Sequence, residues 1–320
     1  MKNMMRQLLF LLIRNGNRVF VKLNKKRFNK RIAIVSCDKW IGKVKEDELL
    51  KFELNKLLVD VDIISWQDKS IDYNKYDAVI IRSLWGYQDY IEEFIEYLDK
   101  LKKDNVKVFN NVDILKDNLN KHEQFKILDK YEIPHIDTFF LKKNELDKVG
   151  KIHEEYKDLV VKPIISGSGN NTFIISDTIN KNNIRIDEVK DKFDGVLNNI
   201  NNYLMVQPFV KEIDEGEISV VLIDNKVSHI VIRNTSVFND KGSICVVGLD
   251  TMDSKMKSIV DSCTKIKEYK DALYMRVDLV KIDDDYKVME LELVEPQLFL
   301  GFRKTKKELT NFAKAIKKKI

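Results

Sequence analysis

The sequence predicts a doubly wound α/β domain followed by a region built from hairpin strands. Between residues 31 and 111, short apolar runs alternate with helical spacings of apolar residues, which is typical of parallel strands connected by helices. Beyond residue 159, strand-like runs are joined by short polar or glycine-rich segments instead. The chain has 320 residues and is 44% hydrophobic, enough for one large domain or two to three smaller ones.

The elements of the first domain follow from its apolar patterns. The expected helices span residues 46–58 and 91–101, and the expected strands span residues 31–35, 61–66, 76–82 and 106–109. The segment 76–82, YDAVIIR, has the uninterrupted apolar core of a parallel strand that is covered on both faces. No GxGxxG motif follows the first strand, so the sequence does not support a dinucleotide site there.

Ligands of such sheets bind beyond the carboxyl ends of the strands. Two segments qualify, residues 36–40 after the first strand and residues 82–87, RSLWGY, after the third. The second segment combines a cation, a hydroxyl and two aromatic rings, which suits a small carboxylate substrate. We therefore predict substrate contacts in this loop, the alternative being that its aromatic rings only pack; the residues are Arg82, Ser83, Trp85 and Tyr87.

A lysine and a glycine-rich loop mark the middle of the chain. Residues 116–131 are expected to form one polar helix, in which Lys121 would ordinarily be a solvated charge. The strand at 159–163 carries Lys162 and leads into SGSGNN at 166–171. A point charge beside flexible backbone donors is suited to covering phosphates. The order is not that of a Walker motif, because no GK[ST] occurs and the lysine precedes the loop.

The next apolar run, LMVQPFV at residues 204–210, is interrupted by a Gln-Pro pair. We expect backbone groups near Phe209 and Val210 to pair with an adenine edge, leaving Glu217 for ribose hydroxyls. A further strand at 226–233 ends in the cation Arg233. His229 lies in the apolar alternation of that strand and is predicted to be a hydrogen-bonded sheet residue rather than a catalyst.

Residues 271–300 predict a β-hairpin with strands at 274–280 and 286–294 and a turn at 283–285. The alternation of the second strand places Val288, Glu290, Glu292 and Val294 on one face, and Met289, Leu291 and Leu293 on the other. Neighbouring carboxylates on one face repel each other unless a cation lies between them.

Asp278, on the first strand of this hairpin, joins the carboxylates if the register allows. Such an all-oxygen set suits Mg²⁺, which proteins hold with one or two carboxylates together with a nucleotide's phosphates. Arg276 shares the face of Asp278 and would meet phosphate oxygens. The alternative is a solvated strand face on which Glu290 and Glu292 are merely exposed.

Charge is distributed unevenly along the chain. The formal net charge is +5, but residues 1–30 hold nine lysines and arginines and no acidic residue. Removing these nine from the 56 basic residues leaves 47 against 51 acidic residues, a net charge of −4 for the rest. A nucleic-acid-binding function of the whole protein is therefore excluded.

The basic leader at 1–30 contains a six-residue apolar run at 8–13, too short to span a membrane, and lacks a secretory cleavage site. It could lie on an anionic membrane surface as a basic amphipathic helix, although Asn15, Gly16 and Asn17 would break that helix. The alternatives are a segment that packs on the body and a disordered tail.

Cysteine and histidine usage favours neither a disulfide framework nor a zinc site. The three cysteines are far apart, which indicates a reducing, cytoplasmic compartment. Cys37 follows a strand and is expected to be a buried structural thiol. The four histidines are scattered, so neither zinc ligation nor a histidine triad is indicated.

Taken in order, these pieces resemble the ATP-grasp ligase family. The resemblance covers about residues 31–300 and depends on Lys121, Lys162 with its glycine loop, Gln207 to Val210 with Glu217, Arg233, Arg276 with Asp278, and Glu290 with Glu292. RSLWGY, QPFV and the pair MRVDLV and MELELVEPQLFL are in addition similar to the cyclo-ligases of the D-cycloserine pathway and their glutathione-synthetase-like relatives.

The resemblance implies an α/β preATP-grasp domain at 31–112 and an ATP-grasp domain at 113–320. The latter would have two α+β subdomains, at about 113–205 and 206–320, that clasp the nucleotide. ATP would be the nucleotide, with one or two Mg²⁺ ions, or Mn²⁺ in their place.

The resemblance also implies roles for particular residues. Arg233 and Arg276 would stabilise phosphoryl or acyl-phosphate charge, and Asp278, Glu290 and Glu292 would hold the metal. The expected ATP contacts are Lys121, Lys162, the lid residues Ser166, Gly167, Ser168 and Gly169, the hinge residues Gln207, Pro208, Phe209 and Val210, and Glu217.

Three departures from the family pattern stand out. Glu292 takes a position that is Asn in many ATP-grasp enzymes. The loop RSLWGY lacks the hydroxyl and carboxylate of the relatives' RSTWDY at Leu84 and Gly86, which indicates a different substrate if this loop contacts it. The basic leader also lies outside the family pattern.

We expect a carboxylate–amine ligase that forms an amide through an acyl phosphate and releases ADP and phosphate, with small-molecule carboxylate and amine substrates. The rivals are a ligase that modifies a peptide or protein docked through the leader, and a non-catalytic nucleotide-binding scaffold. Homodimers are frequent among the relatives, but the sequence identifies no interface, and it does not name the substrates.

Overall fold

The computed structural model describes residues 11–14, 17–20, 28–167, 169, 171–179, 182–198, 200–234 and 243–320. Its first sheet is parallel and has the strand order β4-β3-β5-β6, formed by β3 (Lys30–Ser36), β4 (Val59–Ser65), β5 (Ala78–Ile81) and β6 (Val108–Phe109). Helices α1 (Lys45–Lys56) and α2 (Ile91–Lys103) connect these strands. The predicted doubly wound α/β domain is therefore confirmed, and the buried Ala78–Ile81 core shows why it reads as a parallel strand.

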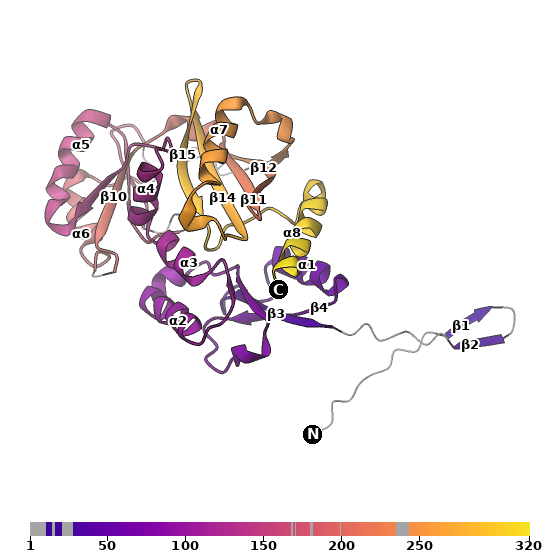
Figure 1. Ribbon diagram of the computed structural model, residues 1–320. Helices are drawn as coiled ribbons and strands as arrows, with labels where there is room; N and C mark the ends of the chain where they lie inside the picture. Colours follow the sequence, from indigo (N-terminus) through magenta and orange to yellow (C-terminus); the bar gives the residue numbers. More distant parts are fainter. Residues whose placement is uncertain are drawn as a thin grey trace.

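Two antiparallel sheets follow the α/β domain (Figure 1). The middle sheet has the order β7-β10-β8-β9 and is formed by β7 (Phe139–Lys142), β8 (Leu159–Pro163), β9 (Phe173–Ile175) and β10 (Tyr203–Pro208). Its helices are α5 (Val149–Tyr156) and the short α6 (Val189–Phe193). Strands β8 and β9 form a hairpin around the glycine-rich segment.

The C-terminal sheet has the order β13-β12-β11-β14-β15. It consists of β11 (Glu217–Ile223), β12 (Lys226–Asn234), β13 (Ser243–Val247), β14 (Tyr274–Ile282) and β15 (Asp285–Glu292). Two helices belong to this part, α7 (Ser254–Cys263) and α8 (Lys306–Lys319). Strand β15 is an edge strand of this sheet, so the outward-facing amides and carbonyls of its backbone need partners from elsewhere.

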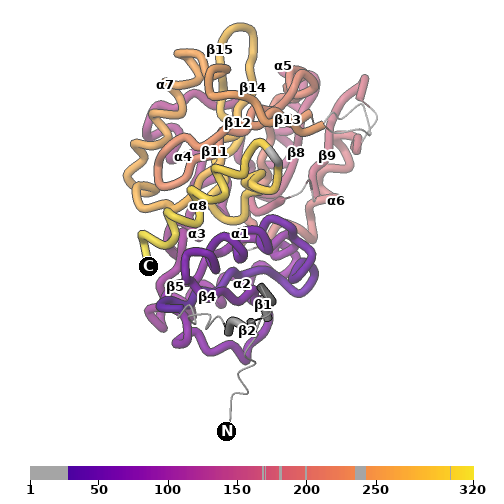
Figure 2. Tube along the Cα trace, turned by 90° about the vertical axis from the view of Figure 1, so that its right-hand side faces the viewer, coloured from indigo at the N-terminus to yellow at the C-terminus, as the bar shows by residue number. Residues whose placement is uncertain are grey.

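The α/β domain and the C-terminal sheet share buried cores. One core joins Val79 and Ile81 of β5 to Val277 of β14 and Leu291 of β15. A second joins Leu50 of α1 to Phe312 of α8, which lies beside α1 in both views (Figures 1 and 2). Burial of such apolar surface contributes about 25 cal/mol per Å². Apolar packing therefore holds the α/β domain and the C-terminal sheet together.

The prediction of a single polar helix at 116–131 is wrong, because the structure shows two helices there. Helix α3 (Val112–Leu119) ends before Asn120, and α4 (Lys121–Lys130) begins after it. Asn120 has extended backbone angles, and its side-chain oxygen accepts from the amide of His122 at 2.9 Å. An asparagine N-cap satisfies amides that a new helix would otherwise leave unpaired, so the chain turns at this residue.

The predicted alternation of the last strand also needs a correction. The register pairs Asp278 with Glu290 but Leu279 with Val288, so β15 has an extra residue, Met289, at a β-bulge. The bulge turns Val288 into the core beside Leu291, whereas strict alternation had placed Val288 on the face of Glu290 and Met289 beside Leu291. The strict pattern holds only from Glu290 onward.

Where the structure describes the basic leader, it shows strands and not the helix proposed from the sequence. Strands β1 (Leu11–Arg14) and β2 (Asn17–Phe20) form an antiparallel pair, with Leu11 opposite Phe20. The rest of residues 1–27 lies outside the described residues. Within the described part of the chain, no helix is both long and apolar enough to span a membrane.

Candidate active site

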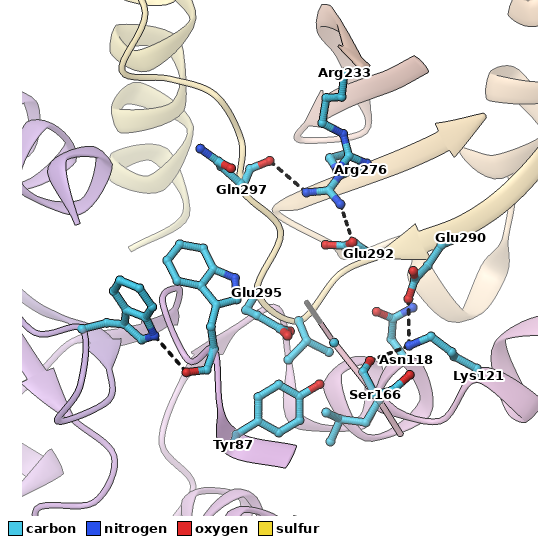
Figure 3. Close-up of a pocket in the computed structure, with 15 residues that line it drawn as sticks. Tyr87, Asn118, Lys121, Ser166, Arg233, Arg276, Glu290, Glu292, Glu295 and Gln297 are labelled. Atoms are coloured by element: carbon cyan, nitrogen blue, oxygen red, sulfur yellow. Dashed lines mark hydrogen bonds and ion pairs between the residues drawn. The ribbon is translucent and has the colours of Figure 1, made fainter. Parts of the chain in front are cut away.

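The largest cluster of predicted site residues lines a pocket of about 420 Å³. This volume lies within the range of about 300–1,000 Å³ that is usual for small-molecule sites. The pocket is lined from three parts of the chain, as Figure 3 shows: the α/β domain, the helix pair α3–α4 with the glycine loop, and β12, β14 and β15. Its lining residues are Trp40, Trp85, Tyr87, Asn118, Leu119, Lys121, Ser166, Gly167, Arg233, Arg276, Glu290, Glu292, Val294, Glu295 and Gln297.

The hairpin β14–β15 brings a cation and three carboxylates together. Asp278 lies opposite Glu290, and Arg276 lies opposite Glu292, because the register matches these pairs across the two strands. The guanidinium of Arg276 donates two bonds of 2.8 Å to the oxygens of Asp278 and pairs with Glu292 as well. It also donates to the backbone oxygen of Gln297 at 3.2 Å. These contacts hold the guanidinium of Arg276 in place at the wall of the pocket.

Arg233 completes a second cationic group beside the first. Its Nε donates to Ser219 Oγ at 2.9 Å, and Ser219 Oγ donates to Asp278 at 2.7 Å. Its terminal nitrogen lies 3.1 Å from Asp278 and pairs with Glu217, the residue opposite it on β11. Asp278 is 1% exposed and is shared by two arginines. A buried carboxylate in this position orients both guanidinium groups.

Lys121 faces the pocket because it is the first residue of α4. Its ammonium donates to the backbone oxygen of Ser166 at 2.7 Å and lies 3.0 Å from Glu290. Its own amide donates to Ile164 O at 3.1 Å, which ties the start of α4 to the chain after β8. Lys121 is 6% exposed. It is therefore a buried pocket lysine and not the solvated helix charge that its neighbours alone suggest.

The pKa values of the carboxylates at the site are shifted in opposite directions. Burial raises the pKa of Glu217 to about 8 and that of Glu292 to about 7, each further raised by neighbouring Asp278. Burial likewise raises the pKa of Glu295 to about 8, with Glu292 adding to it. The pKa of Glu290 is lowered, since Lys121 and Lys162 outweigh the opposing effect of burial.

Side-chain amides hold the edge of β15 in place. Asn118 accepts from the amide of Leu293 and donates to Leu291 O, both at 2.8 Å. Gln124 accepts from the amide of Leu291 at 2.9 Å and donates to Leu291 O at 2.8 Å. Asn110 donates to Leu293 O at 2.8 Å. These buried amides replace a neighbouring strand, and the residues that they fix flank Glu290 and Glu292.

Several predicted ATP contacts lie outside this pocket. Lys162 lies on β8, where burial lowers its pKa while the charge of Glu290 opposes that shift. Gln207 donates to Thr138 Oγ1 at 2.9 Å, and the amide of Phe209 donates to Asp158 O at 2.8 Å. The Phe209 amide is therefore already used, contrary to the expectation of an unpaired donor there. Pro208, Val210 and Gly169 do not line the pocket, and Ser168 lies outside the described residues.

Only part of the predicted substrate loop reaches the pocket. Trp85 and Tyr87 line it, but Arg82 is 4% exposed, pairs with Glu46 at 2.5 Å and donates to Pro296 O at 3.0 Å. Ser83 Oγ donates to Asp47 at 2.5 Å. These polar side chains are used to join the loop to α1 and to the segment after β15. The structure shows His229 and Cys37 as predicted, both buried, with His229 Nε2 2.8 Å from Leu298 O.

The predicted metal ligands do not form a ready-made ion cage. Among the described residues, no three acidic, histidine or cysteine side chains are close enough together to hold a metal. Glu290 and Glu292 nevertheless both line the pocket. Because Mg²⁺ usually takes one or two carboxylates and completes its shell with phosphate oxygens and water, these two residues fit it together with a nucleotide.

Sequence reasoning missed Glu295, Asn118 and Gln297 as pocket residues. Glu295 follows the last strand in the same sequence stretch as Glu290 and Glu292, so its position could have suggested it. The sequence signal for the Asn120 cap was also present, since Glu123 lies three residues later as in a capping box. The contacts of Asn118 could not be predicted from the neighbouring sequence, because its partner Leu291 is 173 residues away.

Comparison with known proteins identifies the family of the chain. Residues 32–110 match the family model of the N-terminal domain of D-cycloserine synthetase DcsG, and residues 128–269 match that of the prokaryotic glutathione synthetase ATP-grasp domain. Together these two matches identify an ATP-grasp ligase. The chain belongs to this family of ATP-dependent ligases that form carbon–nitrogen bonds.

Within the family, the chain is similar to the cycloserine biosynthesis protein DcsG of Streptomyces lavendulae. The two are 21% identical over 262 residues, which cover 76% of this chain and 84% of that protein. The crystal structure of D-cycloserine synthetase DcsG superposes with a TM-score of 0.75 at 18% identity, over 90% of this chain and 99% of that one.

Two further solved structures share the fold. D-alanine–D-alanine ligase from Bacillus anthracis complexed with ATP has a TM-score of 0.60 at 19% identity and covers 90% of this chain and 96% of its own. The macrocyclase MdnC from Microcystis aeruginosa, bound with its precursor peptide MdnA, has a TM-score of 0.63 at 10% identity. It covers 90% of this chain and 99% of its own. The predicted ATP-grasp fold is confirmed by these matches.

Proposed function

We propose that the protein is a carboxylate–amine ligase that uses MgATP to form an amide. The observation that supports this most is that Arg233, Arg276 and Lys121 converge on one pocket with Glu290 and Glu292. Phosphoryl transfer needs this combination, because charge spreads over the transferring group and must be neutralised in place. The similarity to DcsG, a cycloserine biosynthesis protein, supports a role in small-molecule biosynthesis.

The proposed reaction has two steps. A carboxylate oxygen of the first substrate attacks the γ-phosphorus of ATP, the bond from that phosphorus to the β,γ-bridging oxygen breaks, and ADP leaves. The nitrogen of the amine then attacks the carbonyl carbon of the acyl phosphate and loses a proton. The bond from that carbon to the phosphate oxygen breaks, and phosphate leaves with one oxygen of the original carboxylate.

The residues of the site divide these tasks between them. Lys121 and Lys162 bind nucleotide phosphates, and Arg233 and Arg276 stabilise the charge of the acyl phosphate. Glu290 and Glu292 would hold one or two Mg²⁺ ions, or Mn²⁺, and the bound metal would supply positive charge that neutralises the phosphates. Asp278, predicted as a third ligand, is shared by two arginines, and we propose that it orients them.

The nucleotide base and ribose are assigned to the side of the site away from the α/β domain. Residues 207–210 form the adenine hinge, and Glu217 binds the ribose hydroxyls. The loop at 166–171 covers the phosphates and excludes the water that would hydrolyse an acyl phosphate. Trp85 and Tyr87 contact the substrate from the α/β side, as their position in the pocket supports.

The proposal is tested by measuring ADP and phosphate release from MgATP with pooled amino acids and small amines. We expect release that needs one carboxylate and one amine and that falls to background when either is omitted. ATP hydrolysis that ignores both pools would contradict the proposal. Tight ATP binding without turnover would also contradict it and would favour the non-catalytic scaffold.

A ligase that modifies a peptide is the second candidate. It is favoured by the shared fold with MdnC, whose structure was determined with a precursor peptide, and by the nine basic residues of the leader. Deleting residues 1–30 separates the two. Unchanged turnover of small substrates after the deletion would show that the leader is no part of the small-molecule site, whereas loss of activity only toward an acidic peptide would favour peptide modification.

A further inference from the structure

The α/β domain carries the basic leader and the ligand pocket at opposite ends of its parallel sheet. The leader runs into Lys30, the first residue of β3, whereas Trp40 and Trp85 of the pocket follow the carboxyl ends of β3 and β5. Strand β3 has seven residues, which corresponds to a length of about 23 Å. A partner that binds the leader is therefore kept about one strand length away from the pocket.

The end of helix α8 reaches the place where the leader joins the α/β domain. The turn at residues 57 and 58, just before β4, accepts two hydrogen bonds there. The amide of Asn29, at the end of the leader, donates to Leu58 O at 3.3 Å, and Lys317 Nζ of α8 donates to Leu57 O. Figure 2 shows the end of α8 beside the α/β domain. The leader and the end of α8 thus share one end of the molecule.

Helix α8 carries a row of lysines on its outer side. Its buried side packs on the core that it shares with α1. The opposite side is exposed at the helical spacing i, i+4, i+7 and i+11, where the residues are Lys307, Asn311, Lys314 and Lys318. The three lysines of this row, called the α8 lysines below, form no ion pair within the described part of the chain. The outer side of α8 is therefore positively charged up to the end that meets the leader.

The leader combines basic and apolar residues. Its nine lysines and arginines occur without an acidic residue, and between them lie the apolar runs LLFLLI at 8–13 and VFV at 19–21. Nucleic acid or a purely acidic peptide would attract the charges but would leave the apolar runs in water. An anionic bilayer surface suits both, because its headgroups attract lysine and arginine while its acyl boundary takes up apolar side chains.

The hairpin within the leader also requires a partner. Its register pairs apolar residues away from the turn, Leu11 with Phe20 and Leu12 with Val19, and Arg14 is the last residue before the turn. The two strands form a sheet of their own. A single two-stranded hairpin is at best marginally stable in water. A further surface is therefore needed to bury the apolar pairs.

We infer that the leader and the α8 lysines dock together on an anionic membrane surface and hold the pocket end of the protein away from it. This inference goes beyond the proposed ligase function and does not rest on it. The leader and α8 meet at residues 57 and 58, so both can contact one lipid surface at the same time. The charges attract the protein to the headgroups, and the apolar runs of the leader then enter the interface.

The test measures binding of the full chain to vesicles that are collected by sedimentation. Vesicles of phosphatidylcholine with an equal amount of phosphatidylglycerol would be compared with vesicles of phosphatidylcholine alone. Each binding curve would be repeated at about 1 M salt, where the Debye length is only about 3 Å. We expect the wild-type protein to bind the anionic vesicles at low salt, and to bind neither the neutral vesicles nor the anionic ones at high salt.

The contribution of α8 is tested by removing two charges from its outer side. The variant Lys314→Gln with Lys318→Gln should bind the anionic vesicles about tenfold more weakly or worse. The matched control is Lys151→Gln with Lys190→Gln, because these lysines are likewise exposed but lie on α5 and α6. The control should bind as the wild type does. Urea unfolding and ADP release should be the same in all three proteins.

The apolar contribution is tested by Leu12→Ser with Ile13→Ser, which keeps every charge of the leader. Binding to the anionic vesicles should weaken by about tenfold or more, since apolar area no longer enters the interface. Soluble polyglutamate offers negative charge without an apolar boundary. Any binding to this polymer should therefore be weaker than binding to the vesicles and should not change in the variant.

Other outcomes would overturn the inference. Absence of binding to the anionic vesicles at low salt would refute it, as would equal binding to both kinds of vesicle. Unchanged vesicle binding by the variant of α8 would also overturn it, because α8 would then be no part of the docking surface. Tighter binding to polyglutamate than to the vesicles, with no effect of the two serine substitutions, would replace the membrane with an acidic polypeptide as the partner.

Discussion

Replacing Gln124 by methionine tests whether the side-chain amides of α3 and α4 hold the catalytic edge strand. Gln124 is 1% exposed and makes two hydrogen bonds to Leu291, at 2.9 Å to its amide and 2.8 Å to its oxygen. Methionine keeps the length of the side chain but provides no amide. Leu291 lies between Glu290 and Glu292, so any shift of its backbone moves both carboxylates.

The cost follows from the groups that are left unpaired. The buried Leu291 N–H loses its side-chain partner, which costs about 1–3 kcal/mol, and the lost bond to Leu291 O adds about 1 kcal/mol, because Asn118 still donates to that oxygen at 2.8 Å. We therefore expect the free energy of unfolding to fall by about 2–4 kcal/mol. The kcat for ADP release should fall by about tenfold or more, as expected when catalytic groups are displaced by a fraction of an ångström.

Urea unfolding and ADP release, measured on the same preparations, give both quantities. Gln67→Met is the matched control, because Gln67 accepts one hydrogen bond, at 2.9 Å, from the amide of Asp38 in an exposed loop. Its stability should change by less than about 1 kcal/mol. If Gln124→Met unfolds at the wild-type urea concentration and retains full activity, the amides do not hold β15 and the reasoning is wrong.

Three further substitutions or treatments test other parts of the account. Glu290→Gln should abolish ADP formation, by about 100-fold or more, with the fold retained because the amide can still accept from Lys121; full activity would exclude Glu290 from metal binding. Burial raises the pKa of Asp47 to about 6 against the opposing effect of Arg82, so between about pH 4 and 6 the folded state holds a proton that the unfolded chain has released, and stability falls as pH rises through this window. Relative to Asp47→Asn, the wild-type free energy of unfolding should therefore decrease by up to about 3 kcal/mol from pH 4 to pH 8; parallel pH profiles in urea unfolding would contradict this. Lys121→Met should weaken MgATP binding and also destabilise the fold by about 3 kcal/mol, because Glu290 loses its ion-pair partner; a double variant with Glu290→Gln should recover part of the stability but no activity.

The arrangement of the catalytic hairpin could be predicted because strand alternation is a local property. The two-residue spacing of Arg276 and Asp278, and of Glu290 and Glu292, fixes which side chains share a face, and the observed register pairs them across the strands. The bulge at Met289 could not be predicted in the same way. It depends on packing of Val288 into the core and on the bond from its amide to Pro134 O at 2.8 Å, a contact with a distant segment.

The difference between local patterns and distant contacts also explains why the role of the substrate loop was predicted only in part. For the leader, a local signal was present but was overlooked. RSLWGY has the composition of a binding loop, but the partners that occupy Arg82 and Ser83 come from α1, 36 residues earlier. Local composition shows which groups can bind a carboxylate; it does not show which are already paired. For the leader, the Asn-Gly pair at 15–16 separates two short strands, and this dipeptide is a known hairpin signal, which a search for helical periodicity overlooks.

The central claim is that the pocket between the α/β domain and the β14–β15 hairpin transfers a phosphoryl group from ATP to a carboxylate. The most direct measurement follows heavy-isotope oxygen from a labelled carboxylate substrate into the products. We predict that one labelled oxygen per turnover appears in inorganic phosphate, and that the amide keeps the other. Unlabelled phosphate together with ADP would mean that water, not the carboxylate, accepts the phosphoryl group, and would contradict the proposed ligase mechanism.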